Sequence, residues 1–207
     1  MGCKRILLSD DYYPALAQAN VDVRSDGIVE VRERSVVAGD GSELAMDAII
    51  FGTGFQVSPT PIASRIRGRD GRTLQEHWTP SMEAYLGLSV AGFPNLFLLI
   101  GPNTGLGHNS MVFMVESQLN YLMGCLDEVR RRGASAVEVR REAQRRFNGD
   151  VDRRMRGTVW AVGGCRSWYV DATGRNTSLW PGWSVGFRWR TRRFEPHKYR
   201  FAHAPGR

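Results

Sequence analysis

The chain has 207 residues, of which 42% are hydrophobic and 24% are charged, and its formal net charge is +7. This is the composition of a globular protein that can bury a core, as one domain or as part of a larger one. Even the longest apolar runs, such as residues 96–100, are far shorter than the roughly 20 residues that cross a bilayer, so we expect no transmembrane segment. Three cysteines without a CxxC pair argue against a disulfide framework or a zinc site, and they favour the reducing cytoplasm.

The positive charge gathers in four stretches, at residues 130–132, 140–146, 153–156 and 188–200. A basic patch attracts phosphate whatever the base sequence, but charge alone indicates no fold. We interpret these stretches as solvated helix faces and a surface tail, some of them near an anionic cofactor. The last stretch mixes arginine with tryptophan, as single-strand binders do, yet no nucleic-acid fold is recognisable and no such partner is expected.

The first part of the chain predicts short strands. Residues 4–9 indicate a strand that runs into a polar turn, and residues 20–23 indicate a second extended piece. Residues 28–33 alternate apolar and charged side chains, which is typical of a half-exposed strand. The turn Gly39-Asp40-Gly41 then reverses the chain towards a further strand.

Two wholly apolar runs predict buried strands. Residues 48–51 should be covered on both faces, like a central strand of a layered sheet, and Gly52-Thr53-Gly54 follows at once. Residues 96–100 predict another buried strand, which Gly101-Pro102 stops. Residues 56–84, between the two runs, show little periodicity and predict an irregular excursion with one short helix.

A glycine-rich loop, residues 103–108, leads from the second apolar run to a long helix. Asn109 or Ser110 is a good N-cap. The basic run 130–132 and then Gly133 close the helix at the negative end of its dipole. We expect the methionines of this helix to lie in the core. Between the two ends, apolar side chains recur at helical spacing: Met111, Met114, Val115, Leu119, Leu122, Met123, Leu126 and Val129.

The remainder of the chain predicts a strand at 136–139, a charged helix at 142–155 and, from 159, a segment rich in tryptophan and glycine. The order of strand, glycine-rich loop and helix indicates an α/β fold. A strand that ends in glycines at a helix N-terminus can bind negative charge, because free N–H groups and the helix dipole converge there. An ordinary strand-to-helix connection fits the same residues. The loop is neither a complete G-x-G-x-x-G nor a P-loop.

Several motifs taken together resemble one family. They are Gly2-Cys3-Lys4-Arg5 before Asp11-Tyr12-Tyr13, residues 47–55, Tyr85-Leu86-Gly87-Leu88, Gly92 to Phe97, Gly101 to Gln118, Ser167-Trp168-Tyr169 and Gly174-Arg175-Asn176. In order and spacing they resemble the flavoprotein monooxygenases of the Baeyer–Villiger and flavin-containing kind, over nearly the whole chain. The Lys-Arg and Tyr-Tyr pairs with Tyr-Leu-Gly-Leu are the specific part. One departure is Gly52, where the family usually has alanine.

The resemblance implies FAD and NADPH as cofactors and a reaction that inserts one oxygen atom from O2 through a flavin peroxide. A ketone would become an ester, or a soft nitrogen or sulfur centre an oxide. Lys4 matches a position near the 2′-phosphate of NADP, where a point cation is apt. Arg5 matches the family's active-site arginine, whose permanent charge would stabilise the anionic peroxide. A surface arginine at a strand edge is the alternative for Arg5.

The resemblance also implies roles for loop residues. Thr53 and Gly54 match the connection where the chain passes between the two nucleotide-binding domains, and their implied role is close backbone packing. The loop Gly105, Leu106, Gly107, His108, Asn109 and Ser110 matches the helix start that faces the flavin ring. Trp168 matches an aromatic segment near the nicotinamide. For His108 a loop hydrogen bond is expected rather than a role as general base, because no acidic partner is close in sequence.

The fold implied is a partial two-dinucleotide-binding-domain, Rossmann-like flavoprotein fold. We expect residues 1–46 to end an NADP-binding domain, 47–158 to form the C-terminal part of an FAD-binding domain, and 159–207 to be an aromatic and basic segment. No G-x-G-x-x-G occurs in the chain, so the FAD and NADP fingerprints would precede Met1, and the chain alone is expected to be inactive. A non-catalytic remnant, a partner-binding module and a non-oxygenating flavoprotein reductase remain alternatives. Oligomeric state is not indicated.

Overall fold

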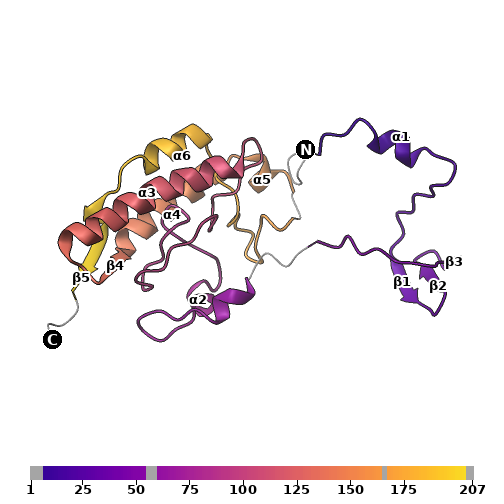
Figure 1. The fold of residues 1–207 in the computed structure, drawn as a ribbon. Helices are drawn as coiled ribbons and strands as arrows, with labels where there is room; N and C mark the ends of the chain where they lie inside the picture. Colours follow the sequence, from indigo (N-terminus) through magenta and orange to yellow (C-terminus); the bar gives the residue numbers. More distant parts are fainter. Residues whose placement is uncertain (1–6, 55–59, 165–166, 204–207) are drawn as a thin grey trace. The chain divides into compact units, whose positions relative to one another are not determined.

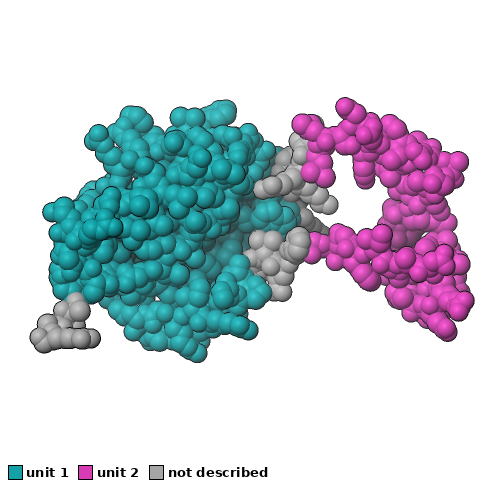
Figure 2. Space-filling model, in the orientation of Figure 1, with its two compact units in different colours: residues 1–5, 56–207 teal, residues 6–55 magenta. Residues whose placement is uncertain are grey.

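The structure is a computed structural model, and it describes residues 7–54, 60–164 and 167–203. Lys4 and Arg5 lie outside the described residues, as does the first half of the strand expected at 4–9, and its second half, residues 7–9, has no regular structure. The chain has a mixed α/β fold and divides into two compact units, a smaller one of residues 6–55 and a larger one that contains residues 56–207 (Figure 2).

The smaller unit is built on an antiparallel meander, with a short helix before it (Figure 1). The helix is α1 (Tyr12–Leu16), and the strands are β1 (Ile28–Val31), β2 (Ser35–Ala38) and β3 (Glu43–Ala45), in the order β1-β2-β3. Arg32 links the outer strands, since its guanidinium contacts Glu30 at 3.0 Å and Glu43 at 2.6 Å. The turn at 39–41 is confirmed. The strand expected at 28–33 exists as β1 over residues 28–31, but all four of its residues are exposed and it is not half-buried.

The larger unit combines helices with a two-stranded antiparallel sheet, β4 paired with β5. Three of its helices, α3, α4 and α6, lie alongside one another, with the sheet near one end of α3 (Figure 1). Its elements in chain order are η1 (Pro61–Ser64), α2 (Leu74–His77), α3 (Met111–Arg132), β4 (Ala136–Val139), α4 (Arg141–Met155), α5 (Val159–Val162), α6 (Ser184–Thr191), η2 (Pro196–Lys198) and β5 (Tyr199–Ala202).

The main core of the larger unit lies between these helices and the sheet. It is rich in aromatic rings, and its fully buried members include Tyr121, Trp180, Phe187 and Tyr199. Cys125 is buried among them, and burial raises the pKa of its thiol to about 12, so it stays protonated and packs as an apolar side chain. Two smaller clusters form around Trp78 and around Tyr169.

Local signals predicted α3, β4 and α4 correctly. The side chain of Ser110 accepts a hydrogen bond from Val112 N at 3.2 Å, which makes Ser110 the N-cap of α3. Gly133 ends the helix with φ at 62°, a left-handed conformation that glycine adopts without strain. Of the irregular excursion expected at 56–84, the structure describes residues 60–84, which contain two short helices, η1 and α2, in place of one.

The buried face of α3 differs from the apolar stripe expected there. Met114 is fully buried, but Met123 is 55% exposed, and Leu119 and Leu126 also lie at the surface. The expectation that all the methionines are core is therefore wrong. The buried face instead includes two polar residues, Ser117 and Gln118, whose hydrogen bonds compensate for burial.

Gln118 joins α3 to two other segments. Its amide nitrogen donates to the carbonyls of Leu86 at 3.0 Å and Gly87 at 3.1 Å, and its side-chain oxygen accepts from Ile100 N at 3.0 Å. All of its side-chain hydrogen bonds are therefore made to backbone groups that form no regular ladder. This fixes the approach to the glycine-rich loop.

The two apolar runs do not form the buried strands expected of them. Residues 48–51 have no regular structure, and Ile50 and Phe51 are 95% and 77% exposed. Residues 96–100 form only an isolated bridge between Ser89 and Phe97, and Ile100 has φ at 58°, which no strand accommodates. A central strand needs paired strands on both sides, and among the described residues neither run has them; residues 96–100 pair only briefly with residues 88–89.

No helix in the described part of the chain is long and apolar enough to span a membrane. Among the described residues, no group of three or more histidine, cysteine, aspartate or glutamate side chains is arranged to hold a metal ion.

We predict that Gln118→Met destabilises the chain by roughly 2–4 kcal/mol, because it leaves a buried N–H and two carbonyls without their partner at nearly constant volume. The equivalent change at the exposed Gln75 of α2 should stay within about 0.5 kcal/mol. Urea unfolding followed by circular dichroism measures both. Equal midpoints for the two variants would show that the buried amide contributes nothing.

Candidate functional site

The glycine-rich loop is held by a segment about 75 residues further along the chain. Asn103 N donates to Thr177 O at 2.8 Å, and Gly105 N donates to Ser178 O at 2.8 Å. Trp180 N returns a hydrogen bond to Gly105 O at 2.9 Å, so residues 103–105 and 177–180 pair in parallel over a short length. The loop before α3 is therefore anchored by backbone hydrogen bonds at its first half.

Side chains reinforce this pairing. The buried Asn103 has φ at 57° and donates to the carbonyls of Asn176 at 2.8 Å and Leu179 at 3.1 Å. The side-chain oxygen of Asn176 in turn accepts from Ser178 N and Leu179 N. Asparagine suits position 103 because it tolerates left-handed backbone, and it suits both positions because its side chain carries a donor and an acceptor.

Two glycines allow other segments to pack closely against the loop: Gly105 faces residues 178–179, and Gly87 faces residues 102–104. A Cβ on Gly105 would lie 2.8 Å from Ser178 O and 3.1 Å from a methyl group of Leu179. Gly87, with φ at 60°, has the side chain of Thr104 directly where a Cβ would stand. Any larger residue at either position would force the backbone apart.

The predicted residues 105–110 are contiguous but divide into two groups. Leu106 is 3% exposed and belongs to the main core, and Gly105 makes the backbone pairing. Gly107, His108, Asn109 and Ser110 are all exposed at the start of α3. The first turn of this 22-residue helix carries no acidic side chain. Its positive end therefore faces an open surface and can stabilise an anionic group.

His108 and Asn109 are each positioned by α6 and the residue before it. The ring of His108 meets that of Trp183 edge to face, with centroids 6.0 Å apart. The amide of Asn109 donates to Ser184 Oγ at 2.6 Å, and its oxygen accepts from Ser110 N at 2.7 Å. Among the described residues His108 has neither a carboxylate partner nor the loop hydrogen bond expected for it, so the aromatic contact takes that place.

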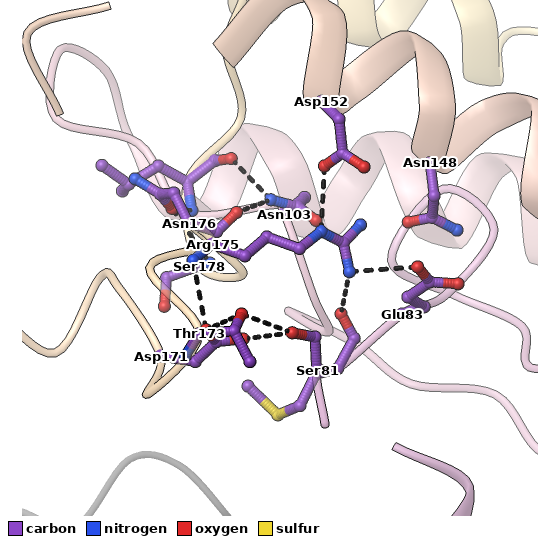
Figure 3. A network of polar contacts seen from close by, with 12 residues as sticks. Ser81, Glu83, Asn103, Asn148, Asp152, Asp171, Thr173, Arg175, Asn176 and Ser178 are labelled. Carbon is purple, nitrogen blue, oxygen red and sulfur yellow. Dashed lines mark hydrogen bonds and ion pairs between the residues drawn. The ribbon is translucent and has the colours of Figure 1, made fainter. Parts of the chain in front are cut away.

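An arginine at the centre of a polar network joins four parts of the larger unit (Figure 3). The Arg175 side chain is 17% exposed and contacts Asp152 of α4 at 2.9 Å and Glu83 at 3.1 Å. It also donates to Met82 O at 3.3 Å. Because Asn176 follows directly, the same turn that holds the loop before α3 is tied to α4 and to residues 82–83.

Asp171 closes the turn that carries Arg175. Its carboxylate accepts from Ser81 Oγ at 2.6 Å, from Thr173 N and Oγ1 at 2.9 and 2.6 Å, and from Arg175 N at 3.1 Å. Burial disfavours the charged form, but these hydrogen bonds outweigh burial and lower the pKa of Asp171. The turn is thus stabilised by an ionised aspartate.

The structure places the other predicted site residues separately. Trp168 is 48% exposed and rests on Tyr169 with ring centroids 4.6 Å apart, and its carbonyl accepts from Ser178 Oγ at 3.3 Å. It therefore lies beside the segment 177–180 that pairs with the loop. Thr53 and Gly54 are exposed residues of the smaller unit, and Gly54 has φ at 85°. Lys4 and Arg5 fall outside the described residues.

Sequence reasoning missed the residues that hold the site in place. Asn103, Gln118 and Arg175 all stood within quoted motifs, but no role was expected for any of them. The spacing Asp171, Thr173, Arg175 in an Asp-x-x-Gly turn was the one available local signal, because aspartate commonly caps its own turn.

We predict that Gly105→Ala destabilises the chain by roughly 1–3 kcal/mol, because the new methyl group meets a backbone carbonyl. Gly107→Ala is the matched control, since its Cβ would have only a carbon of Trp160 near it, at 3.9 Å. Thermal unfolding of both variants tests the close approach. A destabilisation by Gly107→Ala as large as that of Gly105→Ala would contradict it.

Asp171→Asn should cost roughly 1–3 kcal/mol at neutral pH, because the ionised carboxylate accepts four hydrogen bonds. Since the pKa of Asp171 is lowered in the folded state, its contribution is complete above the unfolded value of about 3.9 and is lost as pH falls through the folded value. The gap between wild type and variant should therefore narrow below about pH 4. Asp127→Asn, at an exposed carboxylate of α3, provides the control; a pH-independent gap would refute the assignment.

The chain was compared with known protein families and with curated proteins. No protein-family model matches the chain. It is 54% identical over 200 residues to a Baeyer-Villiger monooxygenase of Streptomyces coelicolor, covering 96% of this chain and 38% of that protein. It is 48% identical over 206 residues to a Baeyer-Villiger monooxygenase of Pseudomonas aeruginosa, covering 99% and 39%. The chain thus spans about two fifths of the length of these relatives.

Solved structures give the same result. An oxidized steroid monooxygenase bound to NADP matches with a TM-score of 0.81 at 27% identity, over 98% of this chain and 40% of that one. Cyclohexanone monooxygenase from Rhodococcus sp. Phi1 bound to NADP+ matches with a TM-score of 0.80 at 26% identity, over 98% and 39%. The resemblance seen in the sequence is confirmed: the chain is a homologue of the C-terminal portion of flavoprotein monooxygenases of the Baeyer–Villiger kind.

Proposed function

We propose that this chain supplies one wall of the active site of an FAD- and NADPH-dependent monooxygenase that inserts one atom of O2 into a small organic substrate. The observation that carries the proposal is the 54% identity over 96% of the chain to a protein named as a Baeyer-Villiger monooxygenase. Because the chain spans about two fifths of that relative, the activity is proposed for the longer protein of which such a segment is part.

The start of α3 fits a flavin. The four exposed residues 107–110 leave the positive end of a long helix accessible, and no acidic side chain in the first turn opposes an anion. FAD, when bound, supplies the redox and oxygen-activating chemistry. The helix end would stabilise the negative charge that reduced flavin carries on its pyrimidine side, and the anchored loop would hold that end in place.

Two residues near the start of the chain are proposed to act on the cofactors. Lys4 binds the 2′-phosphate of NADPH, as a compact ammonium group can. Arg5 stabilises negative charge at the reacting edge of the flavin and, with its high pKa, does so without titrating. Thr53 and Gly54 serve the backbone crossing between two nucleotide-binding domains, and Trp168 lies near the nicotinamide.

The domain division that goes with this proposal ends an NADP-binding domain at residue 46 and an FAD-binding portion at residue 158. The substrate is a ketone converted to an ester, or a soft nitrogen or sulfur centre, and the printed names of the two bacterial relatives favour the ketone. The compartment is the cytoplasm, which is supported by the absence of a CxxC pair.

The first test compares the 207-residue chain with the same chain extended by its upstream coding sequence. We expect only the extended protein to purify with flavin and to consume NADPH together with O2, because the chain itself contains no dinucleotide fingerprint. Flavin absorbance and oxygen uptake measure this. If neither protein binds flavin, the chain is a remnant or a binding module and the proposal fails.

Variants of the extended protein separate the roles of the two basic residues. Arg5→Ala should abolish oxygenated product while NADPH still reduces the flavin, with a loss on the order of a hundredfold or more. Lys4→Ala should raise KM for NADPH and leave KM for NADH unchanged. If Arg5→Ala leaves oxygenated product unchanged, a reductase that does not use oxygen as a substrate is the better assignment.

A further inference from the structure

A basic groove of about 770 Å³ lies on the larger unit, between α4 and the chain from α6 to β5. This volume lies within the range that holds small organic ligands in proteins. None of the residues proposed to bind FAD or NADPH lines it. Its apolar floor includes Tyr85, Leu86 and Phe147, and its wall includes Trp189, whose indole is 66% exposed.

Not every charge in the groove is available to a ligand. Asp150 is neutralised by Arg190 at 2.8 Å and by two arginines of its own helix, Arg153 and Arg154. Glu195 accepts from Lys198 at 2.7 Å and from Tyr85 OH at 3.1 Å. The negative charges of Asp150 and Glu195 are therefore already balanced by protein cations at the base of the groove.

Four other lining arginines have no carboxylate partner among the described residues: Arg140, Arg146, Arg192 and Arg193. Arg140 Nε donates to a backbone carbonyl, that of His197, at 3.0 Å. Arg192 lies flat over the ring of Trp189, with its guanidinium carbon 3.4 Å from the ring centroid. Against these four stands one lining carboxylate without an ion-pair partner, Glu142, which is exposed. The groove therefore carries an uncompensated positive charge.

We propose that this groove binds a nucleoside di- or triphosphate, with the phosphates on the unpaired arginines and the ring against Trp189 and the apolar floor. Guanidinium groups match phosphate oxygens in pairs, which favours phosphate over a single carboxylate. The aromatic and apolar lining gives a ring somewhere to stack, which inorganic phosphate alone would not use. Because Asp150 and Glu195 are already paired with other cations, they do not neutralise these four arginines, whose charge is available to a ligand.

Calorimetric titration of the 207-residue chain with ADP, inorganic pyrophosphate and adenosine tests the proposal. ADP should bind more tightly than pyrophosphate, adenosine should bind more weakly than either, and binding should weaken as salt rises. The double variant Arg146→Glu and Arg193→Glu should weaken ADP binding by about tenfold or more. Arg145→Glu is the matched control, because Arg145 is an exposed neighbour on α4 that does not line the groove.

Two further variants assign the site. Trp189→Phe should remove the change in tryptophan fluorescence that ADP causes while keeping most of the affinity. Lys4→Ala should leave ADP binding unchanged, which separates the groove from the proposed NADPH site. Circular dichroism checks that each variant stays folded.

Three outcomes would overturn the proposal. They are no binding of ADP or pyrophosphate, an equal loss of affinity in Arg145→Glu and the double variant, and tight binding of single-stranded polynucleotide with none of the small phosphates. The last result would assign the groove to nucleic acid. None of these results depends on flavin binding or oxygenation, so the groove and the proposed enzyme activity succeed or fail separately.

Discussion

The larger unit depends on one close approach of backbones, between residues 103–105 and 177–180. The contact joins segments some 75 residues apart, and it is possible only because Gly105 carries no side chain. The loop before α3 follows from it, since one end of the loop is paired and the other is the helix N-cap. The exposed loop residues 107–110 before α3 are therefore held at both ends although they have no regular secondary structure.

The ends of α3 could be predicted because they depend on local interactions, whereas its buried face depends on residues distant in sequence and could not. Ser110 and Gly133 act on backbone groups within four residues of themselves, so the sequence alone indicates them. The buried face of the same helix was mispredicted because Gln118 is buried for its hydrogen bonds to residues 86, 87 and 100. The apolar runs 48–51 and 96–100 were mispredicted because a strand needs partners, and an apolar composition does not show whether they exist.

The candidate site shows the same division. Residues 105–110 were recognised as a unit because they are consecutive, but in the structure Leu106 belongs to the core while residues 107–110 are exposed. Arg175 was quoted only as part of a motif, because its partners Glu83 and Asp152 lie far from it in sequence. The net charge of +7 indicated basic surfaces, but only the ion pairs in the structure show which arginines are neutralised and which are not.

The smaller unit has little buried apolar surface, and this sets its local stability. Among its described residues, Val36 and Ala38 are the only buried hydrophobic side chains, and its strands are otherwise joined by backbone hydrogen bonds and exposed ion pairs such as that between Arg32 and Glu43. Such a segment opens at little free-energy cost. Its amide hydrogens exchange with solvent through local opening and its peptide bonds are accessible to proteases. The amides in the middle of α3 exchange only when the larger unit unfolds as a whole.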